Sequence, residues 1–554
     1  MAVSTHAARL AQRRLNLSKF QPVEFTCPLG WAASGAWTPK AVANAWDRAN
    51  TSQGSSLHSN HVSDSLAAGG SAVRPLQCKR SVDRFFMYAE AGQPDRLADD
   101  LRKVSATELI SLPIRDFFDK CSAQRFSTNG SSSNSGKSQG THQPPYHYFT
   151  ARVADILEAP PPEWETHVLD TFPDRRGNNV PPSQLGYCSV WLGGVGSATQ
   201  AHYDVMHNVF VQAHGFKHFR LWPPSAHVAM AVFPDAHPRA RKSRLHFTGL
   251  DVADSSMKSS SAGAVADPSC EIKEDYATTE VSTALPPLLP PYLDIVLGPG
   301  QALYIPPFWF HHVEVVPAPR GGGDGIHFDS STSSGITHSR DGINRCVDDS
   351  VSVSLNVFSQ ARLTAAVSAV LARPPPSLLQ GLPLRSSNTR DDSNTSSGAV
   401  GRLSSGGLTF ARLARRLGSE LGLGSQFART VLLSRYREVG SAYDFPADPS
   451  PNSRYGAVDD DVGASAIEAA GVQAEAWAVE TANALRIAVR CTEADDGADF
   501  TNHSSNYVSQ ANAAQQEEYF EGVVSVCAAH ILEATALRAF GAIDVEIALE
   551  AAAC

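Results

Sequence analysis

Residues 186–224 read GYCSVWLGGVGSATQAHYDVMHNVFVQAHGFKHFRLWPP, and this stretch decides the fold. Short apolar or alternating runs are separated by glycines and turn residues, which is the pattern of successive β-strands. Residues two apart in a strand project to the same face, so His202 and Asp204 can both point into a barrel. The stretch therefore predicts neighbouring strands that present a histidine and a carboxylate side by side.

Similar short segments lie on both sides of this stretch. The predicted strands cover residues 22–26, 84–88, 186–192, 208–213, 219–222, 294–297, 302–305, 312–316 and 351–358. Many short strands separated by turn residues suggest a sandwich or a barrel. Beyond residue 360 the chain changes to Ala, Leu and Arg at helical spacing, which predicts helices over residues 408–439, 464–491 and 511–552.

The chain is too long for one compact core. Its 554 residues predict two or three domains. Stretches rich in Ser, Gly and Asn cannot bury enough apolar surface to order themselves. We expect disordered surface insertions at residues 50–71, 124–143, 255–269, 321–341 and 385–407.

Charge and cysteine content limit the class of protein. The net charge of −10 argues against a protein that coats nucleic acid indiscriminately, and the basic run at residues 237–246 is read as a solvated loop, with phosphate binding as the alternative. Nine widely spaced cysteines without a CxxC pair predict reduced thiols in an intracellular compartment. No run approaches the ~18 apolar residues that span a bilayer, so no membrane segment is expected.

The N-terminal 20 residues carry basic side chains and no acidic one. This composition is typical of an organelle transit peptide. A short N-terminal helix is the alternative, and it is favoured because a strand-like segment begins at residue 22. We expect the protein in the cytoplasm or the nucleus, with organelle targeting as the alternative.

A metal held by His202 and Asp204 needs a third ligand from elsewhere in the chain. Residues 297–314 read LGPGQALYIPPFWFHHVE, a glycine turn followed by an apolar strand that ends in His311 and His312. Two histidines and one carboxylate on one face of an octahedron leave three positions open, which suits non-haem Fe(II). The sequence thus predicts an iron site with room for further ligands.

Two more side chains complete the predicted site, and two other His/carboxylate pairs compete with it. Lys217 is far enough beyond Asp204 to lie on the next strand, where it can offer a cation to a bound carboxylate, and Thr199 can donate a hydrogen bond beside His202. The triplet 327–329, His-Phe-Asp, has the same spacing but lies in a Gly/Ser-rich segment, so it is not expected to bind metal. The pair at residues 312 and 314 lacks a third partner and is expected to support the site.

These residues resemble the JmjC and cupin-like hydroxylases, a double-stranded β-helix family of Fe(II)- and 2-oxoglutarate-dependent dioxygenases. The resemblance spans roughly residues 22–360 and is specific over residues 186–224, 297–315 and 351–359. Within the family, the run His202–Gln212 with Trp309-Phe-His311 most resembles the tRNA wybutosine hydroxylase. The asparaginyl hydroxylase that acts on hypoxia-inducible factor is similar too.

The resemblance implies a role for each matching position. Its iron ligands fall on His202, Asp204 and His311. Its 2-oxoglutarate contacts fall on Thr199, Asn208, Lys217 and Asn356, with Tyr148 as a further contact and Tyr146 as the alternative tyrosine. Dioxygen would be the other cosubstrate, and 2-oxoglutarate would be decarboxylated to succinate as an unactivated C–H bond is hydroxylated. His207 stands where relatives carry Asp or Gln, which predicts an altered cavity near the cosubstrate.

The predicted fold is mainly β: a double-stranded β-helix of the cupin or jelly-roll type with flanking helices and an all-helical C-terminal region. Residues 1–150 would form the N-terminal part of the cupin-like domain, 151–360 the catalytic core, 361–407 a linker and 408–554 the helical region. The substrate would be a protein side chain or a tRNA base, and a non-enzymatic cupin scaffold is the alternative. The resemblance also implies a homodimer through the C-terminal helices, and a helical cap without a partner is the alternative.

Overall fold

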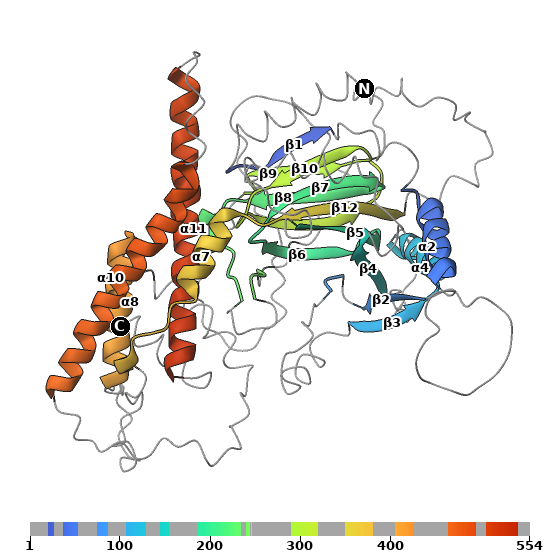
Figure 1. Cartoon of the computed structure of the whole chain (residues 1–554). Helices are drawn as coiled ribbons and strands as arrows, with labels where there is room; N and C mark the ends of the chain where they lie inside the picture. Colours follow the sequence, from blue (N-terminus) through green and yellow to red (C-terminus); the bar gives the residue numbers. More distant parts are fainter. Residues whose placement is uncertain are drawn as a thin grey trace, which may run out of the picture.

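The computed structural model describes a barrel with helices on two sides (Figure 1). It describes residues 20–26, 37–53, 75–82, 84–86, 107–128, 145–153, 186–233, 240–243, 245, 247, 290–319, 350–379, 405–424, 427, 464–494 and 506–540. The N-terminal 19 residues, the triplet 327–329 and most of the five predicted insertions lie outside these ranges.

Eight antiparallel strands form the barrel from two facing sheets. They are β5 (Gly186–Gly194), β6 (Ala198–Tyr203), β7 (His207–His214), β8 (Phe216–Trp222), β9 (Leu293–Leu297), β10 (Gln301–Ile305), β11 (Phe310–Val316) and β12 (Val351–Ser359). The large sheet contains the order β10-β7-β12-β5, and the small sheet has the order β6-β11-β8-β9. Successive strands thus alternate between the sheets, except for β8 and β9, which are neighbours in the small sheet, and this confirms the predicted double-stranded β-helix.

The large sheet continues beyond the barrel on both edges. Strand β1 (Val23–Thr26) pairs with β10, and the other edge carries β4 (Tyr146–Arg152), β2 (Leu76–Ser81) and β3 (Glu108–Leu112). Of these strands only β1 was predicted. The predicted strand at residues 84–88 is wrong in its described part, because Phe85 makes a single parallel bridge to Ala198 instead of a ladder.

Two helices cover the outer face of the large sheet. Helix α2 (Pro39–Gln53) begins with Thr38, whose hydroxyl accepts a hydrogen bond from the Ala41 amide, and with Pro39, a residue that favours the first helical position. Helix α4 (Ile114–Thr128) lies beside it (Figure 1). Their apolar side chains and those of the sheet form one core cluster, so this face is closed to solvent.

Strand β12 shows why the barrel interior is polar. Its sequence VSVSLNVFS alternates as a half-exposed strand does, yet all nine residues are buried. Val353 and Leu355 belong to the core under α2 and α4, whereas Ser354 meets Lys217 of the small sheet across the barrel. The polar residues of β12 therefore face the space between the two sheets.

The C-terminal helices pack against the small sheet and the turns around it. They are α7 (Arg362–Leu371), α8 (Ser405–Leu421), α10 (Ala464–Ala494) and α11 (Asn506–Phe540), with short 3-10 turns η3 (Pro224–His227) and η5 (Ser377–Leu379). One core cluster joins barrel residues such as Phe219 with helix residues such as Leu413 and Val523. Residues 361–407 were predicted as a linker, but α7 and η5 lie inside this segment. Helix α7 is ordered because its apolar face packs on α10 and α11.

Helix α8 ends earlier than the predicted helix at residues 408–439. Gly422 and Gly424 both have positive φ, 74° and 72°, a backbone conformation that suits glycine. The Leu423 amide donates to the Gly418 carbonyl at 2.9 Å, which closes the helix end. Residues 428–439 lie outside the described ranges.

One helical stretch, Ala513–Phe540, is long and apolar enough to cross a membrane, judged by length and composition alone. Of its most apolar segment, 56% is buried inside the molecule. The core helix of a soluble protein passes the same test, and this stretch packs on η3, α7, α8 and α10. Among the described residues Cys78, Cys121, Cys188 and Cys527 are free thiols.

Candidate metal and cosubstrate site

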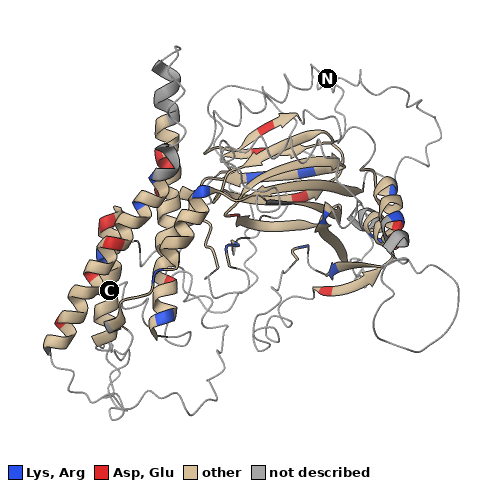
Figure 2. Ribbon diagram, in the orientation of Figure 1, with Lys and Arg blue, Asp and Glu red and all other residues tan. Residues whose placement is uncertain are grey.

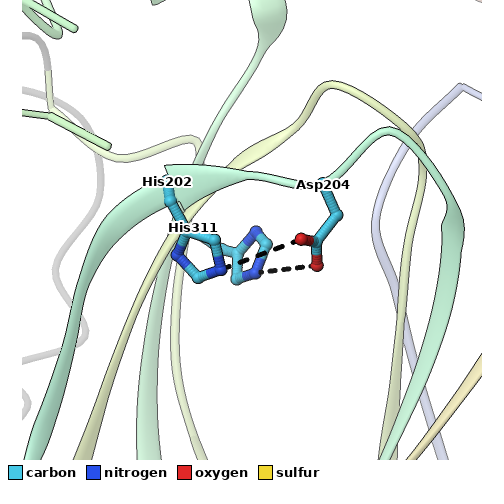
Figure 3. A group of neighbouring side chains, drawn as sticks. All are labelled: His202, Asp204 and His311. Carbon is cyan, nitrogen blue, oxygen red and sulfur yellow. Dashed lines mark ion pairs between the residues drawn. The ribbon is translucent and has the colours of Figure 1, made fainter. Parts of the chain in front are cut away.

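Three side chains converge where β6 and β11 lie side by side (Figure 3). His202 on β6 is directly opposite His311 on β11, and Asp204 follows the end of β6. One ligand atom from each residue lies within 4.8 Å of the others, and the Asp204 oxygens are 3.9 Å and 3.6 Å from the Nε2 atoms of His202 and His311. Ligand atoms about 2.1 Å from a metal are about 3 Å apart, so a small closure would complete the site.

Backbone contacts fix the tautomer of both histidines. The Nδ1 atom of His202 is 2.9 Å from the Gln200 carbonyl, and that of His311 is 3.1 Å from the Trp309 carbonyl. A carbonyl can only accept, so each Nδ1 carries the proton and each Nε2 keeps its lone pair toward Asp204. This is the form in which imidazole binds a metal.

The protonation of His202 agrees with that geometry. Burial is the largest cause that lowers the pKa of His202, the neighbouring His311 and Lys242 act in the same direction, and Asp204 opposes them, with a net pKa of about 3. The imidazole of His202 is therefore neutral at pH 7. The donor set of two histidines and one carboxylate on one side of the site is compatible with Fe(II).

The turn that carries Asp204 is held by the strand opposite. The Phe308 amide donates to the Asp204 carbonyl at 2.6 Å, and Phe308 itself has a positive φ of 65°. The Asn208 amide nitrogen is 3.5 Å from an Asp204 carboxylate oxygen, and Asn356 donates to the Asn208 side-chain oxygen at 3.0 Å. Asn208 and Asn356, both predicted cosubstrate contacts, thus form a chain that leads from the ligand triad into the barrel.

Lys217 brings a charge between the sheets. Its side chain is only 3% exposed, its Nζ donates to the Ser354 hydroxyl at 2.7 Å, and it lies 5.1 Å from the centroid of the Phe210 ring. Among the residues that the structure describes, no carboxylate forms an ion pair with it. Burial lowers the pKa of Lys217 to about 7. A buried amine with only a hydroxyl and an aromatic ring beside it fits an anionic partner.

A register shift between β6 and β11, with one extra residue in β6, brings Thr199 to the same face as His202. Residues three apart normally face opposite ways, but the pairing changes between His311 and Val313, so Thr199 pairs with Val313 while His202 pairs with His311. Val313 shares the inner face of β11 with His311 because they are two apart. Thr199 therefore lies on the same face of the small sheet as His202, and its role as a cosubstrate contact stays a prediction.

Tyr148 lies on the inner face of the large sheet. It pairs with Gly193 of β5, where a Cβ atom would come within 2.9 Å of the tyrosine ring, and it stacks on Phe86 at 5.3 Å. Trp191 lies 5.8 Å from it, centroid to centroid. The alternative tyrosine, Tyr146, is buried nearer the β5–β6 turn, where it approaches Gly196.

The sequence interpretation predicted Asn356 in the interior but missed the polar groups of Trp191 and Ser354. Two buried atoms, Nε1 of Trp191 and Oδ1 of Asn356, have no hydrogen-bond partner in the described structure, which fits an interior that receives a polar ligand. Ser354, the partner of Lys217, was missed as well. The strict alternation of polar and apolar residues in β12 was the signal that could have revealed it.

Three neighbouring residues lie away from the site. His312 faces the opposite side of β11 from His311 and packs between Phe85 and Phe247. Glu314, on the same side as His312, forms an ion pair with Arg84. The side chain of His207 faces Tyr304 on the outer side of the large sheet, with Nδ1 2.8 Å from the tyrosine hydroxyl. The expectation that His207 alters the cosubstrate cavity is therefore wrong.

A double-stranded β-helix that presents two histidines and one carboxylate on its inner surface is a barrel of the cupin type with a candidate metal site. The chain belongs to the Cupin-like domain family, whose model matches residues 19–359, more than half of the 554 residues. Among solved structures, the chain is similar to the X-ray structure of E. coli ycfD with 10% sequence identity and a TM-score of 0.23. That alignment covers 69% of this chain and 61% of the other, less than two thirds of its length.

Proposed function

We propose that the protein is an Fe(II)- and 2-oxoglutarate-dependent dioxygenase that hydroxylates a protein side chain or a tRNA base of the wybutosine type. The observation that carries this proposal is the pairing of an open ligand triad with a buried lysine in the same barrel. A triad alone would fit many metal proteins. The addition of a buried cation without a carboxylate partner is what a dicarboxylate cosubstrate requires.

Each residue of the site has a distinct task in this proposal. His202, Asp204 and His311 would hold Fe(II), and Lys217 with Ser354 would bind the distal carboxylate of 2-oxoglutarate. When bound, the metal would activate dioxygen as the oxidant, with 2-oxoglutarate oxidised to succinate and CO2, for hydroxylation of an unactivated C–H bond. The chain itself orients these groups and keeps water away from them.

The remaining predicted contacts line the same space. Asn208 keeps Asp204 oriented through its amide, and Asn356 in turn holds Asn208. Thr199 would add a hydroxyl from the small sheet and Tyr148 an aromatic side chain from the large sheet.

Basic residues at the edge of β6 favour the hypothesis that the substrate carries a negative charge near the reacting carbon. Residues 241–243 pair with this edge, since Ser243 donates to the Ala201 carbonyl at 2.7 Å and Lys242 forms a bridge opposite His202. Arg241 and Lys242 thus border the triad. A tRNA and an acidic polypeptide are both negatively charged, so either would contact these basic residues. The resemblance to the wybutosine hydroxylase supports a tRNA substrate, and the resemblance to the asparaginyl hydroxylase supports a protein substrate.

The helical region gives less support to nucleic-acid binding. Arg412 pairs with Glu468, and Arg416 with Glu420, so these arginines of α8 are already neutralised. Figure 2 shows both signs of charge interspersed along α8, α10 and α11 instead of one basic face. Because of their position beside the triad, Arg241 and Lys242 are the better candidates for substrate contact.

Conversion of 2-oxoglutarate to succinate by the purified protein with Fe(II) and ascorbate tests the proposal. Wild type should turn over the cosubstrate, more so with total tRNA or with a peptide library, and His202→Ala and Lys217→Ala should abolish turnover. His312→Leu is the matched control, because both ring nitrogens of this buried histidine lack hydrogen-bond partners and an apolar side chain of similar size loses no bond there. Stimulation by one pool would identify the substrate class.

Absence of turnover by wild type with either pool, together with absence of iron binding, would favour the alternative of a non-enzymatic cupin scaffold. Turnover that survives in both site variants would also overturn the proposal.

A further inference from the structure

We propose that His530 of helix α11 positions the metal-binding strand through Tyr203, so that the C-terminal helices set the metal affinity of the barrel. This inference rests on the proposed metal site. It concerns side chains that touch neither the metal nor the cosubstrate. His530 and Tyr203 are thus positioning residues.

Tyr203 connects the triad to the helix. It lies between His202 and Asp204 in the chain, and because neighbours in a strand face opposite ways, its side chain points away from the metal. It is only 1% exposed, and its hydroxyl forms a hydrogen bond with Nε2 of His530. Any movement of this ring would move the backbone that carries both ligands.

The same helix also holds the turn before β11. The hydroxyl of Tyr519 on α11 donates to the Pro307 carbonyl at 3.0 Å. The next residue, Phe308, stacks on Tyr203 with centroids 5.9 Å apart and donates its amide to the Asp204 carbonyl. This turn leads into the strand that carries His311, so α11 holds both metal-bearing segments from the outside.

Helix α11 has little freedom to move relative to the barrel. At Gly522 a Cβ atom would collide with the backbone of Pro224 and Ser225 in η3, so the helix lies against that turn at the closest possible distance. The Ser225 hydroxyl also donates to Glu518 at 3.0 Å. Helix α7 adds a contact on the other side of the triplet, where Thr364 donates to the Val205 carbonyl. Hydrogen bonds from α11 and α7 therefore hold the segment that carries Asp204 on both sides.

Metal affinity measures this effect directly, with Co(II) as the probe under anaerobic conditions and the full chain in each case. His530→Phe and Tyr203→Phe each remove the hydrogen bond but keep a ring, and we expect each to weaken Co(II) binding about tenfold, as loss of supporting contacts to metal ligands does. The double variant should be about as weak as either single one, because both substitutions remove the same hydrogen bond. His530→Gln offers polar atoms at a similar reach and should restore much of the affinity.

Thr535→Val is the matched control. Thr535 lies on the same helix and is buried, but its hydroxyl donates only to the Ile531 carbonyl of its own helix. We expect this variant to lower the melting temperature without changing Co(II) affinity. If His530→Phe also changes only the melting temperature, the positioning role is refuted. If wild type does not bind Co(II), the metal site itself fails, which is a separate outcome.

Discussion

Lys217 brings its amine between the two sheets, where the neighbours are the Ser354 hydroxyl and the Phe210 ring. Burial disfavours the ammonium form, so the pKa of Lys217 falls to about 7. A bound dicarboxylate would favour the ammonium form again. The free protein and the complex should therefore differ in proton content above neutral pH.

The affinity for 2-oxoglutarate should consequently depend on pH. Below pH 7 the free protein already holds the ammonium, so the affinity is flat. Above pH 7 each binding event must take up a proton, so the affinity falls by about tenfold per pH unit until the pKa of the complex is reached. Calorimetric titration of the Mn(II)-loaded protein with 2-oxoglutarate under nitrogen measures this slope.

Lys217→Arg provides the comparison for the pH profile. A guanidinium stays protonated over the same range, so the variant should bind 2-oxoglutarate with an affinity that does not change with pH. Equal slopes in wild type and variant would show that another group takes up the proton.

The candidate metal ligands could be predicted from the sequence, but the contacts that position the residues around them could not. His202 and Asp204 are two apart in a strand, so their shared face follows from periodicity alone. Thr199 is three residues from His202, and only the extra residue of β6 in its pairing with β11 brings it to that face. No periodic pattern in the sequence reveals such a shift.

The turn between β7 and β8 is the tightest point of the barrel. Gly215 has a φ of +70°, and a Cβ there would collide with the Val351 carbonyl of β12. Gly300, between β9 and β10, has a φ of +86° but no atom within 4 Å of an added Cβ. An added side chain at Gly300 would therefore meet only the cost of the left-handed backbone conformation, whereas one at Gly215 would also meet a steric collision.

Alanine at these two positions should destabilise the protein unequally. Gly300→Ala should cost about 1–2 kcal/mol for the left-handed conformation, and Gly215→Ala should cost more because the backbone of β12 must also move. Urea unfolding of both variants and wild type measures the difference. Equal losses of unfolding free energy in the two variants would mean that the backbone of β12 moves away from the added methyl group at no energetic cost.

At the level of elements, apolar strands were predicted more reliably than helices with mixed composition. Strands β7, β10 and β12 have continuous or alternating apolar runs, so their patterns identify them. Helices α2 and α4 were not predicted, since their polar residues conceal the faces that pack on the large sheet. Tertiary packing, which the sequence pattern does not display, decides these elements.

The barrel and the C-terminal helices share one core cluster, which has consequences for the whole molecule. Phe219 and Trp222 of β8 belong to the same cluster as Leu413 of α8, Ala478 of α10 and Val523 of α11. Separation of the helices would expose apolar surface on both sides. A deletion that removes the helices to test for dimerisation would therefore disturb the barrel as well.

The two regions should unfold together. Hydrogen–deuterium exchange by mass spectrometry along a urea series should show loss of protection at one common midpoint for peptides from β7–β8 and from α11. Earlier loss in α11 would show that the helices form a separate unit, in line with the domain organisation predicted from length.

The whole arrangement could be predicted only in outline. Length and composition predicted separate barrel and helical regions, but not that α11 lies against the metal-bearing strands. The bond between Tyr203 and His530 joins residues 327 positions apart, and nothing in either local sequence points to the other. Such contacts depend on the complete fold.

This distance along the chain has a consequence for synthesis and for inherited defects. Ribosomes release residue 311 long before residue 530, so all three ligands are made while the helix that grips them is still missing. On our proposal, metal capture at full affinity should therefore wait until helix α11 has been made. A premature stop codon before the codon for His530 would leave all three proposed ligands encoded and should still yield a protein that binds its metal weakly.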